Sequence, residues 1–188
     1  MLLLIWVWLT KFGIVVVSGD SMNPTYSNED QMIMLRTHAV RNGDTVAIYS
    51  TTMNELLCKR VIGVSGDVVK INKGELSVND IILSEPYIKE NVWGQDIDNF
   101  SVVVPQNFVF VMGDNRNNSM DSRNLGCISS NYIQGKILLD VTRLTGLKDD
   151  SIRVIVYISI FILLILILLS SIIERFRNHR QTKQNVEQ

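Results

Sequence analysis

The sequence predicts a mainly β protein: an antiparallel β-sheet domain with membrane-anchoring helices at both ends, the N-terminal one short. Short β-rich runs, each bounded by Gly, Asn, Asp or Pro, fill the middle of the 188-residue chain, and this pattern is typical of an all-β domain. Two long apolar stretches flank them. We therefore divide the chain into an N-terminal membrane-associated segment (1–17), an exported β-rich domain (18–150), a C-terminal transmembrane helix (152–173) and a polar cytoplasmic tail (174–188).

The N-terminal segment, MLLLIWVWLTKFGIVVV, contains one charge, Lys11. Its length is at the lower limit for a membrane-spanning helix. Three forms stay open: a tilted span whose lysine reaches back to the interface, an apolar strand resting on the bilayer, and a span cut short by a misassigned start codon. A cleaved secretory signal is disfavoured, because no positive region precedes the apolar run and no small-residue cleavage site follows it.

Strands of the middle domain are expected where apolar runs are bounded by turn residues. They cover residues 31–36, 44–50, 55–64, 67–72, 75–80, 101–105, 107–114 and 135–141. RNGD (41–44) and NKGE (72–75) are expected to be hairpin turns, because Asn and Gly tolerate a positive φ. Residues 91–100 show no periodicity and are predicted to form a surface loop.

The C-terminal apolar stretch has no charge from Val154 to Ile173, which is long enough to cross a hydrocarbon core of about 30 Å as a helix. Ile and Leu on all sides of a helix are unusual for a buried soluble helix. Four Lys or Arg follow in ERFRNHRQTK, against three in the fifteen residues before the span. The positive-inside rule therefore favours a cytoplasmic tail and an extracytoplasmic middle domain.

Composition excludes several classes of function. The chain has 18 Lys and Arg and 19 Asp and Glu, for a net charge of −1. It therefore lacks the excess of basic residues that would predict nucleic-acid binding. Neither the two cysteines nor the two histidines have metal-ligand spacing, so we expect no metal and no cofactor. Whether Cys58 and Cys127 form a disulfide is open at this level.

Ser21, in GDSMNPT (19–25), is a candidate nucleophile. Gly19 permits a tight turn, and Pro24 stiffens the chain and restricts Asn23 to extended backbone. A serine hydroxyl needs a base. Neither histidine has a carboxylate at motif spacing, so a Ser-His-Asp triad has little support. A turn serine without chemistry is the ordinary alternative.

Lys59 is the candidate base. In a strand, Leu57, Lys59 and Val61 share one face, so the lysine lies between apolar neighbours. Burial there would lower its pKa from about 10.4, and a neutral amine can accept the proton of a serine hydroxyl. The alternative is a lysine at a strand edge with its ammonium group in water.

The segment FVMGDNRNNSMDSRNLG (110–126) places many polar groups directly after an apolar strand. Its charged residues are Asp114, Arg116, Asp121 and Arg123. Two opposite-charge pairs in this segment would fix a neighbouring site, and Ser119 could hydrogen-bond a neutral lysine and orient it. The alternative is a polar loop without function.

Taken together, GDSMNPT, KRVIGVSGD and GDNRNNSMDSR resemble, in this order, the serine, lysine and C-terminal signature boxes of bacterial type I signal peptidases. EPYIKE (85–90) is similar to the segment between the second and third boxes. The resemblance covers residues 14–141. It implies an antiparallel β catalytic domain near the membrane surface outside the cytoplasm. The implied activity is that of a membrane-bound serine endopeptidase that removes N-terminal signal peptides from exported preproteins.

The resemblance implies Ser21 as the nucleophile and Lys59 as the general base. Some members carry an oxyanion-donating serine two positions before the nucleophile. That position is Gly19 here, so the oxyanion would rely on the backbone N–H of Ser21. A lysine rather than a histidine at the base position separates this chain from the endoplasmic-reticulum type. The family's N-terminal anchor is normally a complete span, and the added C-terminal span could replace it here.

Supporting residues follow from the same resemblance. Ser119 matches the serine that hydrogen-bonds and orients the lysine, and Met22 matches a residue beside the catalytic pair. Asp121 and Arg123 match a salt-bridged pair that supports the site. The other charged residues of that box are Asp114 and Arg116.

Two alternatives belong to other classes of protein. One is a specialised or non-catalytic signal-peptidase-like factor in pilus or surface-protein assembly. The presence of both Ser21 and Lys59 argues against lost catalysis, but not against a dedicated substrate such as pilin. The other is a self-cleaving repressor, which needs a DNA-binding helix pair and no membrane span. The expected partners are signal-peptide-bearing preproteins and the lipid bilayer, with no nucleic acid.

Overall fold

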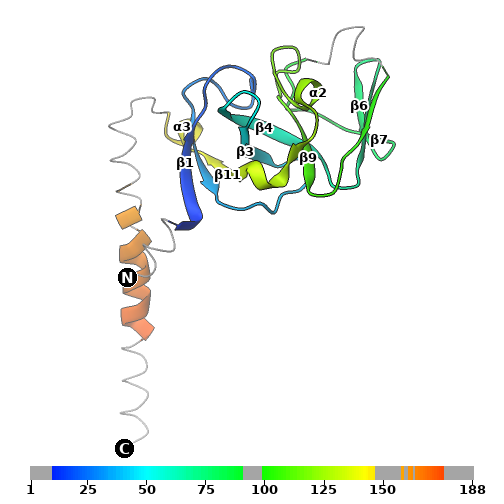
Figure 1. The fold of residues 1–188 in the computed structure, drawn as a ribbon. Coiled ribbons are helices and arrows are strands. Elements are labelled where there is room, and N and C mark those ends of the chain that lie inside the picture. Colours follow the sequence, from blue (N-terminus) through cyan, green and yellow to red (C-terminus); the bar gives the residue numbers. More distant parts are fainter. Residues whose placement is uncertain (1–9, 91–98, 147–157, 159–160, 163, 176–188) are drawn as a thin grey trace, which may run out of the picture. The chain divides into compact units, whose positions relative to one another are not determined.

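A computed structural model describes residues 10–90, 99–146, 158, 161–162 and 164–175. The chain divides into two compact units. The larger unit, residues 4–146, contains the β domain (Figure 1). The smaller unit comprises residues 1–3 and 147–188. The β domain confirms the predicted mainly β, antiparallel fold.

Seven strands form the larger sheet, in the order β1-β2-β11-β3-β4-β9-β10, with every neighbouring pair antiparallel (Figure 1). Their bounds are β1 Phe12–Val16, β2 Gln31–Leu35, β3 Thr45–Ser50, β4 Glu55–Val64, β9 Phe108–Met112, β10 Ile128–Ser129 and β11 Ile133–Asp140. Two short helices, α2 (Ser122–Leu125) and α3 (Val141–Thr145), and the 3₁₀ turn η2 (Ser130–Tyr132) connect or follow these strands.

A smaller antiparallel sheet has the order β7-β6-β5-β8. Its bounds are β5 Val68–Asn72, β6 Glu75–Val78, β7 Ile81–Ile82 and β8 Phe100–Val103. The predicted hairpin at NKGE is confirmed: it joins β5 to β6, and Lys73 and Gly74 have φ angles of 50° and 80°. Two successive positive φ angles match the twist of a two-residue hairpin.

The hairpin prediction for RNGD (41–44) is wrong. The segment does turn, with Gly43 at a φ of 90°. However, β2 and β3 on either side of it are not neighbours, because β11 lies between them and pairs with both. Pairing partners far along the chain, rather than the local turn signal, decide the topology here.

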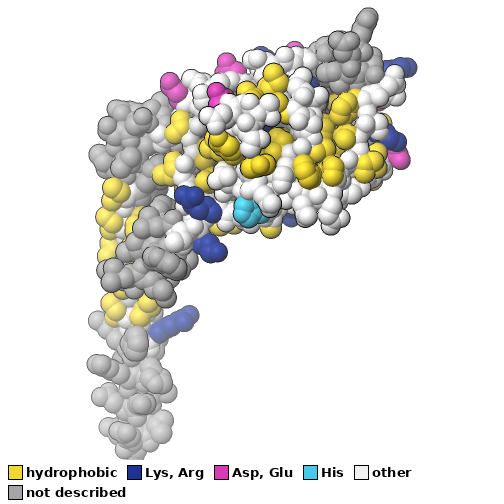
Figure 2. All heavy atoms as spheres, viewed as in Figure 1, with side chains coloured by type: hydrophobic (Ala, Val, Ile, Leu, Met, Phe, Trp, Pro, Cys, Tyr) yellow, Lys and Arg dark blue, Asp and Glu magenta, His cyan; other side chains and the backbone are white. Residues whose placement is uncertain are grey.

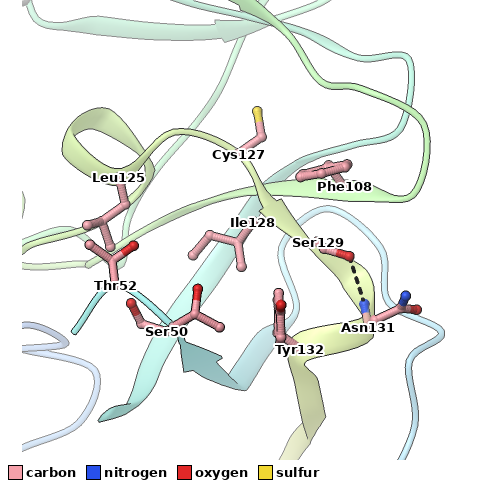
Figure 3. A pocket seen from close by; sticks show the side chains of 10 residues that line it. Ser50, Thr52, Phe108, Leu125, Cys127, Ile128, Ser129, Asn131 and Tyr132 are labelled. Atoms are coloured by element: carbon pink, nitrogen blue, oxygen red, sulfur yellow. Dashed lines mark hydrogen bonds between the residues drawn. The ribbon is translucent and has the colours of Figure 1, made fainter. Parts of the chain in front are cut away.

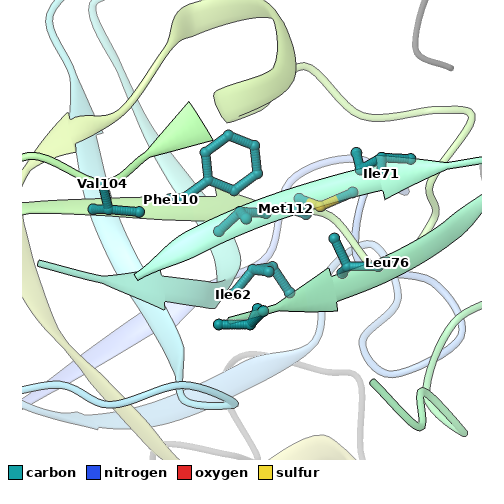
Figure 4. Packing of buried hydrophobic residues seen from close by; sticks show 8 residues of the cluster. Ile62, Ile71, Leu76, Val104, Phe110 and Met112 are labelled. Carbon is teal, nitrogen blue, oxygen red and sulfur yellow. The ribbon is translucent and has the colours of Figure 1, made fainter. Parts of the chain in front are cut away.

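A shared hydrophobic core joins the two sheets. Figure 4 shows side chains of this cluster, contributed by β4 and β9 of the larger sheet and by β5 and β6 of the smaller one. Its labelled members are Ile62, Ile71, Leu76, Val104, Phe110 and Met112. Fully burying one such side chain contributes about 1.5–3 kcal/mol. This core therefore fixes β4 and β9, the two strands that lead into the candidate site.

The surface of the β domain also carries apolar side chains, visible between polar ones in Figure 2. Ile81, Ile82 and Val103 are among the exposed large apolar residues. They lie on β7 and β8, which are the two edge strands of the smaller sheet. The smaller sheet is thus buried where it meets the shared core and open at its edges.

The described part of the N-terminal segment forms a strand, which is one of the three forms that the sequence left open. Residues 12–16 form β1, which among the described residues is an edge strand, paired with β2 in the register Ile14 to Ile33, so the alternative of a helix running through residue 17 is wrong. Val15 and Val17 are buried while Ile14 and Val16 are about half exposed. This period-two alternation is that of a strand with one face in the core. Residues 1–9 of the predicted membrane-associated segment lie outside the described residues.

In the C-terminal unit, residues 164–175 are helical. Within the part of the chain that the structure describes, no helix has the length and apolar character needed to cross a membrane. The predicted transmembrane helix (152–173) lies partly outside the described residues. The same holds for nearly all of the predicted tail (174–188) and for most of the predicted loop (91–100).

Candidate active site

Ser21 and Lys59 lie in contact. Lys59 Nζ donates a hydrogen bond of 2.6 Å to Ser21 Oγ, although the two residues are 38 positions apart in the sequence. A nucleophile and a base within about 2.6–3.2 Å of each other have the geometry that nucleophilic catalysis requires. The contact between Ser21 and Lys59 that the sequence suggests is therefore present in the structure.

The Ser21 loop is held in place by backbone contacts. Gly19 has a φ of 83°, a conformation that glycine adopts at little cost, and its N–H donates to Asn28 Oδ1 at 2.9 Å. The carbonyl of Ser21 accepts the N–H of Asn115 at 3.0 Å. Met22 is fully buried. The loop is thus fixed on one side by the core and on the other by the 110–126 segment.

Lys59 lies in the middle of β4, opposite the fully buried Val46 of β3. The lysine residue is 3% exposed. Burial lowers the pKa of Lys59, because desolvation disfavours the ammonium form. Asp121, Cys58 and Asp114 act in the opposite direction, while Arg123 reinforces the lowering. The net direction is toward a neutral amine, which is the form a base needs.

One of the two ion pairs expected within the 110–126 segment is present. Arg123 contacts Asp121 at 2.8 Å with both partners buried. Asp121 also accepts the backbone N–H of Gly113 at 2.9 Å, and Arg123 Nη2 donates to the carbonyl of Arg116 at 2.6 Å. This pair therefore ties together the two ends of the loop that follows β9.

The second pair of the segment is not formed as predicted. Asp114 instead binds Arg60 of β4, with Nε at 2.8 Å from Oδ1 and Nη2 at 2.6 Å from Oδ2. Arg116 binds Glu85, with contacts of 2.8 and 2.5 Å. Sequence reasoning missed Arg60 and Glu85, whose partners lie 54 and 31 residues away. Their sequence signal was their place inside the matched segments, Arg60 in KRVIGVSGD and Glu85 in EPYIKE.

Ser119 differs from the expectation. Its hydroxyl is buried and has no hydrogen-bond partner among the described residues, so the predicted hydrogen bond to Lys59 is not formed. The Lys59 amine makes its hydrogen bond to Ser21 instead. Ser119 packs against Gly113, where an added Cβ would lie 2.3 Å from its Oγ and 2.4 Å from the carbonyl oxygen of Ser21. The absence of a side chain at position 113 lets these elements approach.

A separate cavity of about 450 Å³ contains neither Ser21 nor Lys59 (Figure 3). It is lined by residues 50–52 and by side chains from the region of β10, including Cys127 and Tyr132. Cys58 and Cys127 are both free thiols, so the disulfide left open by the sequence is not formed. Burial raises the pKa of Cys127, which makes a reactive thiolate in this cavity unfavourable.

Comparison with known proteins agrees with the resemblance found in the sequence. The sequence model of the family "Signal peptidase, peptidase S26" matches residues 1–141. "Signal peptidase I U" of Bacillus subtilis (strain 168) is 35% identical over 133 residues, which cover 64% of this chain and 70% of the relative. "Signal peptidase I S" of the same organism is 37% identical over 137 residues, or 66% and 73% of the two chains.

Among solved structures, a signal peptidase I from Enterococcus faecalis V583 is similar, with a TM-score of 0.47 and 30% sequence identity. The match covers 54% of this chain and 97% of that one. The family match, by contrast, spans 141 of the 188 residues. This chain therefore belongs to the S26 family of signal peptidases, as a hydrolase of the bacterial type I kind.

Proposed function

We propose that this chain is a membrane-bound serine endopeptidase that cleaves N-terminal signal peptides from exported preproteins, with Ser21 as nucleophile and Lys59 as general base. The single observation that carries the proposal is the 2.6 Å contact between Lys59 Nζ and Ser21 Oγ in a buried setting. A non-catalytic assembly factor would have no need of such a contact. A dedicated substrate would still be compatible with it.

In the first half of the proposed reaction, neutral Lys59 accepts the hydroxyl proton of Ser21 as Oγ attacks the scissile carbonyl carbon. The carbonyl oxygen becomes an oxyanion, for which the backbone N–H of Ser21 is the proposed donor. When this intermediate collapses, the C–N bond breaks and the Lys59 ammonium protonates the leaving amine. The products are the free N-terminus of the mature protein and a Ser21 ester of the signal peptide.

In the second half, Lys59 takes a proton from water, and the resulting hydroxide adds to the ester carbonyl. Collapse releases the signal peptide as its carboxylic acid, which then ionises in water, and the Lys59 ammonium returns its proton to Ser21 Oγ. The same amine thus serves as base and acid in turn. It can do so because burial lowers its pKa, while the neighbouring carboxylates keep the ammonium form accessible.

Strand β1 offers a docking edge for the substrate. Among the described residues, β1 pairs with β2 only, and it ends directly before the Ser21 loop. An extended peptide can add to such an edge through main-chain hydrogen bonds, with pockets for alternate side chains. The side chains of Ile14 and Val16, which are about half exposed, would line shallow pockets that accept small residues near the cleaved bond.

The proposed location of the catalytic domain is the extracytoplasmic side of the cell membrane, with residues 152–173 as a span and residues 174–188 inside. The apolar composition of 152–173 and the Lys and Arg that follow it support this arrangement. A cysteine introduced at position 188, in intact cells, should resist an impermeant thiol reagent. Labelling there would reverse the proposed topology.

Cleavage of a preprotein by purified protein in detergent tests the function itself. Ser21→Ala and Lys59→Ala should each abolish the product while leaving thermal unfolding little changed, because the two groups act as one unit. N-terminal sequencing of the product identifies the cleaved bond. Substantial turnover by Ser21→Ala would remove Ser21 from the nucleophile's role.

A further inference from the structure

A short segment between the lysine box and the C-terminal box touches all three segments that build the candidate site. We call this segment, residues 85–89 of EPYIKE, the clasp. The hydroxyl of Thr25, four residues after Ser21, lies 3.5 Å from the carbonyl oxygen of Tyr87, while its one proton is donated to Asp114 Oδ2. The backbone N–H of Lys89 donates to the carbonyl of Asp114 at 3.1 Å. The remaining contacts of the clasp are made by side chains and reach two buried guanidinium groups.

The first guanidinium is that of Arg60, the residue next to Lys59. The central carbon of this guanidinium, Cζ, lies 3.9 Å from the centre of the Tyr87 ring. Its Nε and Nη2 atoms donate the two hydrogen bonds to Asp114. The side chains of Arg60 and Asp114 are 11% and 0% exposed. Tyr87 therefore covers the face of Arg60 that the carboxylate leaves free, and a cation over an aromatic ring is attracted to it.

The second guanidinium is that of Arg116. It binds both carboxylate oxygens of Glu85, and these side chains are 1% and 8% exposed. Arg116 Nε also donates to the carbonyl of Gly113 at 3.1 Å. The hydroxyl of Tyr87 donates to Glu85 at 2.8 Å. The two guanidinium contacts are thus linked through the clasp.

We propose that Tyr87 and Glu85 are positioning residues for the base, and that they act on Lys59 by holding Arg60 on Asp114 and Arg116 on Gly113. The proposal rests on the proposed function, because it assumes that Lys59 is the base. Neither clasp residue is placed in contact with the reacting atoms. Their effect passes through the ion pairs that surround the Lys59 amine.

The charge around Lys59 gives this arrangement a measurable consequence. The groups that act on the Lys59 amine are Asp121, Cys58, Arg123 and Asp114. Asp114 raises the pKa of Lys59, and Arg60 compensates Asp114 by binding both of its oxygens. Without the ring of Tyr87, Arg60 would be held less firmly and the Asp114 charge would be less compensated. The pKa of Lys59 should then rise, and less of the lysine would be neutral at pH 7.

The test is the pH dependence of kcat/KM for cleavage of a signal-peptide substrate by full-length enzyme in detergent. Tyr87→Leu removes the ring, whereas Tyr87→Phe keeps the ring and removes only the hydroxyl. Tyr87→Leu should move the midpoint of the ascending limb to higher pH by about half a unit and lower kcat/KM at pH 7 about threefold. Tyr87→Phe should leave that midpoint in place. Burial, reinforced by Glu85, raises the pKa of Tyr87, so the phenol itself does not titrate in this range.

Tyr132→Leu is the matched control, because Tyr132 lines the separate cavity of Figure 3. It should behave as the wild type. The proposal is overturned if Tyr87→Leu and Tyr87→Phe share one midpoint, or if Tyr132→Leu shifts the midpoint equally. If thermal unfolding shows that Tyr87→Leu does not fold, Tyr87→Met keeps the apolar volume and is judged by the same criterion.

The same assay separates failure of this proposal from failure of the proposed function. If the proposed function fails, Ser21→Ala retains full turnover whatever the clasp variants do. If only the clasp proposal fails, Ser21→Ala is inactive and the ascending limb of Tyr87→Leu coincides with that of the wild type. A merely structural role would lower the unfolding temperature without moving that limb.

Discussion

Gly113→Ala should impair catalysis as well as stability. The added Cβ would lie 2.3 Å from Ser119 Oγ, 2.6 Å from Ser119 Cβ and 2.4 Å from the carbonyl oxygen of Ser21. Ordinary van der Waals contact begins near 3.4 Å, so the Ser21 loop and Ser119 must together yield by about 1 Å. Overpacking of this kind destabilises by about 1–3 kcal/mol. A displacement of about 1 Å at a reacting group lowers the rate about 100-fold.

The assay compares kcat and thermal unfolding for the wild type, Gly113→Ala and Gly135→Ala. Gly135 of β11 is the matched control. Its added Cβ would lie 2.5 Å from the carbonyl oxygen of Leu35, and its nearest neighbours, Leu35 and Met34, do not belong to the candidate site. Both variants should lose similar stability, but only Gly113→Ala should lose about 100-fold in kcat. Equal kcat losses, or a fully active Gly113→Ala enzyme, would refute the reasoning.

Three further predictions concern the surroundings of the site. Asp114→Asn leaves the Arg60 guanidinium without its buried carboxylate, so the free energy of unfolding in denaturant should fall by about 3–5 kcal/mol; an unchanged midpoint would contradict this. Phe110→Ala opens a cavity in the shared core and should cost about 3–5 kcal/mol, whereas Val103→Ala at an exposed position should stay within about 0.5 kcal/mol. Burial raises the pKa of Cys58 to about 12, so mass spectrometry should find this thiol alkylated slowly at pH 8 in the folded protein and rapidly after unfolding. Equal rates in both states would show that the thiol is not protected.

The strand that carries the candidate base could be predicted closely from the sequence. The sequence predicts a strand over residues 55–64, and β4 has the same bounds. The reason is local: an apolar run between turn residues leaves few alternatives. The same period-two logic placed Lys59 on the face of Val61, which is buried in an apolar cluster. Local pattern was sufficient here because a strand's faces are fixed by its own backbone.

The partners of the buried charges could not be predicted in this way. Asp114 and Arg116 lie two residues apart and were expected to pair within their own segment. In the structure they bind Arg60 and Glu85 instead. A buried charged side chain pairs with whichever opposite charge the fold places beside it. The distance between two residues along the sequence does not predict which pair will form. For the same reason, the contact of Tyr87 with Arg60 could not be predicted from the sequence.

The N-terminal apolar segment shows a different limit. Its residues 12–16 have the composition of a membrane segment, but they form β1 because β2 offers a partner strand. Short apolar runs are ambiguous between helix and strand. Tertiary pairing resolves the ambiguity, and it places β1, which pairs only with β2 among the described residues, immediately before Ser21.

The most direct test of the serine–lysine mechanism is the pH–rate profile of the wild type beside Lys59→Arg, with purified full-length enzyme and a signal-peptide substrate. Wild-type kcat/KM should rise with pH through a midpoint below the value of about 10.4 for a free lysine, because burial lowers the pKa of Lys59. Lys59→Arg should be inactive across the range, because a guanidinium keeps its proton in proteins. A robustly active Lys59→Arg enzyme would contradict the account and require another base.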